Sequence, residues 1–80
     1  MLLYDISLES LEQNILFIPA LGLSYELNET AKEILQLLIQ ERSVQEIAQA
    51  LASKYDRDWR EVYIDVIDFI HKLKVYGLVK

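Results

Sequence analysis

Few side chains in this sequence are of the types that carry out chemistry at an active site. His71 is the sole histidine and there is no cysteine, so a zinc site would lack its usual nitrogen and sulfur ligands. The simpler interpretation of His71 is a half-exposed helix residue. The chain has two glycines, too few for a loop that cradles a phosphate group. Neither Ser10 nor Ser43 has a base near it in sequence that would make it a nucleophile.

Glu61, Asp65 and Asp68 follow one another at helical spacing, which could suggest paired carboxylates for acid–base catalysis. However, Lys72 comes four positions after Asp68, where opposite charges meet on a helix surface. A solvated charged face is therefore the better interpretation. The sequence predicts no catalytic residue, no metal site and no cofactor.

The composition predicts one globular domain spanning residues 1–80. The chain is 52% hydrophobic and 26% charged, which is ample for a core and ordinary for a surface. Its longest apolar run, residues 15–23, contains a proline and a glycine and is much shorter than the roughly 20 residues that cross a bilayer. Without cysteines or a basic-flanked N-terminal signal, we expect a cytoplasmic protein with no membrane partner.

The net charge of −5 is unevenly distributed along the chain. Residues 1–41 hold seven acids and one base, whereas residues 42–80 hold seven bases and six acids. The first part would repel a phosphate backbone and the second offers no basic stripe, so we expect no nucleic-acid partner. A winged-helix nucleic-acid-binding domain stays open as an alternative, because the order of helices permits a helix-turn-helix.

Three short strands are predicted in the N-terminal part, followed by three helices. Apolar and polar residues alternate over residues 2–8 and 23–27, and residues 15–18 are β-branched and aromatic. Helices are expected at about residues 29–41, 44–54 and 59–76. Asn28, Ser43 with Glu46, and Asp58 supply the caps that begin them. The predicted fold class is therefore α+β, with a three-stranded antiparallel sheet before a three-helix bundle.

The last helix carries more apolar residues than one core-facing side requires. One face suffices to bury it and carries Val62, Val66, Phe69, Ile70 and Leu73. A second apolar group lies about 100° further round, beside His71 and Lys74: Tyr63, Ile64 and Ile67. Either this group widens the contact with the sheet, or it is the exposed wall of a groove. Trp59 is interpreted as a packing lid in preference to a base-stacking side chain, because acids surround it.

From Leu27 to Leu78 the chain resembles the PqqD family. That family includes the peptide chaperone of pyrroloquinoline quinone biosynthesis and the recognition elements of ribosomally made, modified peptides. Residues 17–19, Phe-Ile-Pro, stand where the family often has a strand that ends in proline. The matching residues are Leu27-Asn28-Glu29-Thr30-Ala31, Ile34-Leu35, Glu41-Arg42-Ser43-Val44-Gln45-Glu46-Ile47, Leu51, Tyr55-Asp56, Val62, Asp65-Val66, Phe69-Ile70, Leu73 and Gly77-Leu78.

The resemblance implies a winged helix-turn-helix-like fold and a non-catalytic function. Such proteins bind the leader segment of a precursor peptide and present it to a modifying enzyme, such as a radical SAM enzyme. The leader is added as a strand between the third strand and the third helix. A generic protein-interaction module is a further alternative, and the exposed strand edge would also allow a homodimer. The expected peptide-binding residues are Leu23, Ser24, Tyr25, Glu26, Leu27, Tyr63, Ile64, Ile67, His71 and Lys74.

Overall fold

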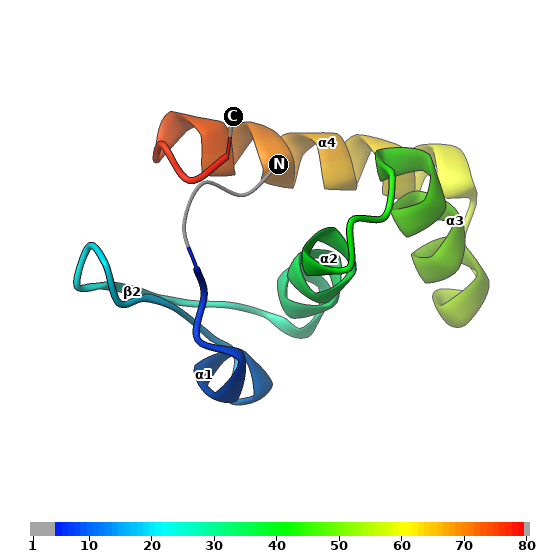
Figure 1. Ribbon diagram of the computed structural model, residues 1–80. Helices are drawn as coiled ribbons and strands as arrows, with labels where there is room; N and C mark the ends of the chain where they lie inside the picture. Colours follow the sequence, from blue (N-terminus) through cyan, green and yellow to red (C-terminus); the bar gives the residue numbers. More distant parts are fainter. Residues whose placement is uncertain (1–4, 80) are drawn as a thin grey trace.

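The computed structural model describes residues 5–79 and has an α+β architecture with four helices and a two-stranded antiparallel sheet. Figure 1 shows α4 along one side of the molecule and α1 at the opposite side, with the sheet at one end and α3 at the other. In chain order the elements are α1 (Leu8–Glu12), β1 (Ile15–Ile18), β2 (Leu23–Glu26), α2 (Glu29–Ile39), α3 (Val44–Tyr55) and α4 (Trp59–Val75).

The two strands form a hairpin in which Ile15 lies opposite Glu26 and Ile18 opposite Leu23. β1 has the range expected from the sequence, and β2 ends one residue earlier than expected. Pro19 ends β1 because proline has no N–H to donate to the sheet. Gly22 closes the turn with a φ of 66°, in the left-handed region that glycine adopts without strain.

The strand expected over residues 2–8 needs correction. Residues 2–4 lie outside the described part, residues 5–7 form no strand, and a helix begins at Leu8. Ser7 begins that helix by accepting a hydrogen bond from the N–H of Ser10, and Leu11, one helical turn along, is buried. The Ser7 cap and the burial of Leu11 thus override the alternation. The three-stranded sheet is not found in residues 5–79, and the winged-helix-like arrangement stays a prediction.

The capping residues predicted from the sequence begin the three longer helices. The side chain of Asn28 accepts from the N–H of Ala31 at 2.8 Å at the start of α2. Ser43 and Glu46 accept from each other's backbone N–H groups at 3.1 and 3.0 Å, which is a capping box. Asp58 accepts from the N–H of Arg60 at 2.9 Å and so begins α4.

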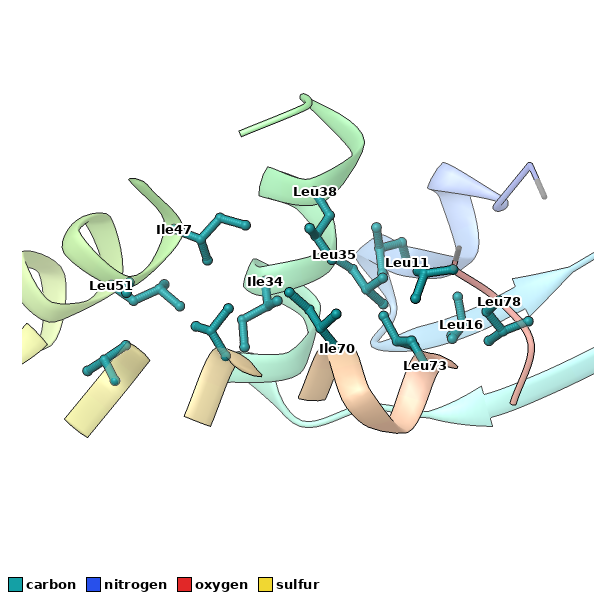
Figure 2. Close-up of a cluster of buried hydrophobic side chains, with 14 of the residues drawn as sticks. Leu11, Leu16, Ile34, Leu35, Leu38, Ile47, Leu51, Ile70, Leu73 and Leu78 are labelled. Carbon is teal, nitrogen blue, oxygen red and sulfur yellow. The ribbon is translucent and has the colours of Figure 1, made fainter. Parts of the chain in front are cut away.

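The hydrophobic core joins every helix to the hairpin. Figure 2 shows Leu11 of α1, Leu16 of β1, Leu35 of α2 and Ile47 of α3 in one cluster with residues of α4. After α4 the chain turns at Gly77, whose φ is 76°, and returns Leu78 and Val79 to the core. This return packs the end of α4 into the cluster that also holds the hairpin.

Candidate functional site

The outer edge of β2 is the first feature of the candidate site. The N–H of Leu27 donates to the carbonyl of Asn14 at 2.8 Å, which makes these two residues a hydrogen-bonded pair of the antiparallel ladder. Bonded and non-bonded pairs alternate, so the N–H and C=O groups of Ser24 and Glu26 point away from β1. In residues 5–79 no other strand pairs with this outer edge.

The opposite edge of the hairpin differs, because the N-terminal segment lies along it. The N–H of Ser7 donates to the carbonyl of Phe17 at 3.1 Å. Phe17 is the partner of Ser24 in the ladder, so its outward carbonyl agrees with the alternation deduced above. Within the described chain, β2 therefore provides the free edge of this sheet.

The inward face of β2 contacts the end of α4. Tyr25 and Leu27 are half-buried and pack on the core, whereas Leu23 is 41% exposed. The ring of Tyr25 stacks on the ring of Tyr76, the residue that ends α4, with 5.3 Å between the ring centroids. This stack brings the C-terminal end of α4 next to β2.

A cleft of about 360 Å³ opens between the start of α2 and the middle of α4. Its apolar side chains are Ala31, Ile34 and Phe69. One residue that lines it, Asn28, comes two positions after the end of β2 in sequence. The remaining side chains that line it are polar or charged: Asn28, Thr30, Arg57, Asp65, Asp68 and Lys72.

Four residues of α4 define the side of the helix that faces β2 and the cleft. Asp65, Phe69, Lys72 and Tyr76 follow one another at intervals of four, three and four, so they share one side of the helix. Asp65, Phe69 and Lys72 line the cleft, and Tyr76 contacts β2. We call these four residues the cleft flank. β2 and the cleft therefore lie along the same side of α4.

The charges of the cleft balance, in contrast to the acidic N-terminal part of the chain. Arg57 pairs with Asp65 at 3.3 Å and with Glu61 at 3.9 Å. Asp68 and Lys72 form no ion pair with another described residue. The two bases and two acids that line the cleft leave it neutral in a chain of charge −5.

None of the ten residues expected to bind the peptide lines the cleft. Tyr25 of β2 contacts Tyr76 of the cleft flank, whereas the five expected residues of α4 lie elsewhere around the helix. At about 100° per residue, Ile67 lies about 140° from Lys72 and about 160° from Phe69 around the helix axis. The five residues, all exposed, are Tyr63, Ile64, Ile67, His71 and Lys74. Their contact with a peptide stays one prediction, and contact of the same exposed face with a second protein is the competing one.

Sequence reasoning did not single out Phe69, Lys72 and Tyr76 as a functional group. The sequence places Phe69 on the core face of the last helix and Tyr76 at the end of that helix. Their spacing from Asp65 does mark one side of a helix, and that signal is present in the sequence. Which side of α4 faces β2 follows from the Tyr25–Tyr76 stack, which joins residues far apart in the chain.

A network of polar groups between α2 and α3 lies outside the cleft. Glu33, whose side chain is 12% exposed, accepts hydrogen bonds from Lys54 and, at 2.7 Å, from the hydroxyl of Tyr55. Burial raises the pKa of Glu33, but these hydrogen bonds and the charge of Lys54 outweigh it and leave the pKa below its ordinary value. The network therefore holds a charged carboxylate between two helices.

A metal site and a membrane span find no support in the described part of the chain. No three histidine, aspartate or glutamate side chains in residues 5–79 are grouped so that they could hold a metal ion. Across the same residues, no helix combines the length and the apolar character that a membrane span requires.

Comparisons with known proteins point to one family. The family model described as coenzyme PQQ synthesis protein D (PqqD) matches residues 8–79. A solved structure of lasso peptide synthetase B1 complexed with the leader peptide is 30% identical, with a TM-score of 0.71 over 80% of this chain and 75% of that one. TbiB1 in complex with the TbiA(beta) leader peptide is 26% identical, with a TM-score of 0.74 over 82% and 77%. No curated protein matches the chain.

Proposed function

The chain belongs to the PqqD family, and from this we propose that it is a non-catalytic chaperone for a ribosomally made precursor peptide. It captures the leader segment of that peptide and presents it to a modifying enzyme, such as a radical SAM enzyme, in the cytoplasm. Two similar solved structures are described as complexes with leader peptides, which supports the leader as the ligand.

The observation that carries the proposal is the outer edge of β2, with which no other strand of residues 5–79 pairs. A peptide can join this edge as a further strand, held by backbone hydrogen bonds and selected by pockets for its side chains. Ser24 and Glu26 each offer one N–H and one C=O, so four hydrogen bonds are available. Alternate side chains of the added strand would point toward the cleft flank and could enter the cleft.

The magnitudes indicate that both the edge and the cleft are needed. Four ladder bonds at about 1 kcal/mol each and two buried apolar side chains at about 2 kcal/mol each give about 8 kcal/mol. Ordering a flexible peptide removes several kcal/mol of this gain. Micromolar binding requires about 8 kcal/mol net, so the peptide must make further contacts. Ala31 and Phe69, both partly exposed, are apolar side chains of the cleft that can supply them.

The direct test is a titration of isotope-labelled protein with the synthetic leader peptide encoded in the same gene cluster. We expect saturable shifts of the amide signals of residues 24–26 and of the cleft flank. A scrambled leader of the same composition is the control and should cause no saturable shift. Saturable binding whose shifts avoid residues 23–27 would contradict strand addition, and the absence of any binding would contradict the function itself.

A pairing of two copies through β2 would compete with the peptide for the same edge. The proposal therefore predicts that any such dimer dissociates as the leader is added. Sedimentation of the protein with and without the leader measures this directly. A dimer that persists at saturating leader would mean that the free edge is not the binding site.

A further inference from the structure

Five large apolar side chains form an exposed row along α4. Trp59, Tyr63 and Ile67 follow one another at intervals of four residues, which places them along one ridge of the helix. The row spans nearly the whole of α4, and none of its members lines the cleft. We call it the outer stripe; its residues and exposed fractions are Trp59 (43%), Tyr63 (37%), Ile64 (60%), Ile67 (41%) and Val75 (72%).

We propose that the outer stripe is a second docking surface and that it binds the modifying enzyme while the leader occupies β2. This inference rests on the proposed function. A protein that presents a bound peptide must contact the receiving enzyme through a surface that the peptide leaves free. The outer stripe and the cleft flank lie on different sides of α4, so each can be covered while the other is occupied.

The side chains of the stripe suit a protein partner. Trp59 and Tyr63 meet edge to face with 6.1 Å between ring centroids, which gives the start of the stripe a rigid aromatic surface. Tryptophan and tyrosine are enriched among the residues that dominate binding energy at protein interfaces. A ridge at four-residue spacing fits an apolar groove in the manner of helix-in-groove recognition.

The charges around the stripe indicate the chemistry of the groove. Arg60, His71 and Lys74 lie among the apolar residues by their position around the helix, whereas Glu61 and Asp68 lie at the border nearer the cleft. Arg60 is paired with Asp58 at 3.2 Å, but Lys74 forms no ion pair with another described residue. The complementary surface is therefore an apolar groove on the enzyme with acidic residues at its rim.

A second copy of this chain fits the stripe poorly. Arg60 and Lys74 lie seven positions before and after Ile67, so an antiparallel two-fold contact centred on Ile67 would bring these two bases together. In a parallel contact, each of these bases would lie beside the same residue of the second chain. The stripe is about 25 Å long and about 10 Å wide, well below the roughly 800 Å² per partner of a stable interface. An enzyme that adds contacts beyond the stripe avoids both difficulties.

The test uses the purified modifying enzyme from the same gene cluster, the full-length chain and the synthetic leader. Ile67→Glu places a charge on the stripe without touching the cleft. We expect the affinity for the enzyme to fall at least about tenfold, because an unpaired charge would be buried in the interface. The affinity for the leader should remain within about twofold of the unsubstituted chain, since β2 is unchanged.

Two further variants separate the surfaces. Ser24→Pro removes an outward N–H from β2, so it should lower the affinity for the leader and leave the affinity for the enzyme unchanged. Lys74→Glu should lower the affinity for the enzyme but not for the leader. It should also reduce the salt dependence of enzyme binding, because it removes the charge that faces the acidic rim. Asp68→Asn, on the cleft side, is the control and should leave enzyme binding unchanged.

Each outcome has a definite meaning. If Ile67→Glu lowers the affinity for the leader instead of the affinity for the enzyme, the stripe is the wall of the peptide site and the inference is overturned. Unchanged enzyme binding by Ile67→Glu, or no binding of the enzyme by the unsubstituted chain, also overturns it. Failure of the unsubstituted chain to bind the leader contradicts the proposed function, and this arm is measured separately from the enzyme arm.

Discussion

At the scale of single residues, the direction of one backbone N–H separates a structural from a functional position within residues 23–27. Leu27, just after β2, donates its N–H inward to Asn14, whereas the N–H of Ser24 points away from β1. The two positions look alike in the sequence, because both belong to the same alternating stretch. The proposed ladder depends on the outward groups alone.

Ser24→Pro should weaken leader binding about tenfold or more, because it removes one ladder bond and places a ring at the docking edge. The fold should survive, since proline is tolerated at a strand edge whose N–H faces outward. Titration of the synthetic leader measures the affinity, and thermal unfolding checks the fold. Ser24→Ala keeps the N–H and should bind normally; equal binding by both variants would exclude Ser24 from the ladder.

Glu33→Gln should lower the free energy of unfolding at pH 7 by about 1 kcal/mol, because Lys54 and Tyr55 lose a charged acceptor. The pKa of Glu33 is lowered in the folded chain, so its contribution is present above the ordinary glutamate pKa. It is lost as the pH falls through the lowered value. Urea unfolding at both ends of this range should show the variant and the unsubstituted chain converging at low pH. A pH-independent difference would argue against the charge.

At the scale of elements, α4 has three different sides: one is buried, one faces β2 and the cleft, and one carries the outer stripe. The core side was predictable from the spacing of Val62, Val66 and Leu73, all of which are buried. The division of the remaining residues was not, because it depends on where the hairpin lies. The same limit applies to α1, where a helical and an alternating pattern overlapped.

Gly77→Ala should destabilise the protein by about 1 kcal/mol, because alanine is strained at a φ of 76°. No atom lies within 4 Å of the added Cβ, so the effect comes from backbone conformation alone. Glu41→Gly, at a φ of 61°, is the matched opposite and should stabilise by about 0.5 kcal/mol. Chemical denaturation measures both. A neutral Gly77→Ala would mean that the turn does not hold Leu78 in the core.

At the scale of the whole molecule, the sequence predicted the class of fold, the hairpin and the three long helices from local signals. It failed where contacts between distant segments decide the outcome. Ser43 and Glu46 are neighbours and made their cap predictable, whereas Tyr25 and Tyr76 are far apart. The hairpin was therefore within reach of sequence reasoning, and the contact between β2 and the end of α4 was not.

Val66→Glu should unfold the domain, whereas Ile67→Glu should change its stability by less than about 0.5 kcal/mol. Val66 is 0% exposed and Ile67 is 41% exposed, although they are adjacent. An unpaired buried carboxylate costs several kcal/mol, a large share of the roughly 5–15 kcal/mol that stabilises a small domain. Circular dichroism melting curves measure both variants. A folded Val66→Glu would contradict the packing of α4 on the core.

The alternation of inward and outward groups along β2 also limits how much of a leader's sequence the protein can recognise. An added strand turns every second side chain toward α4 and the others toward solvent, and a slip of one residue exchanges the two sets. Ser24 and Glu26 can thus hydrogen-bond only a short stretch of the leader, in which every other side chain faces α4. Leaders that share this sparse signature while diverging elsewhere would still be accepted, so one binder could serve precursors whose overall sequences have drifted far apart.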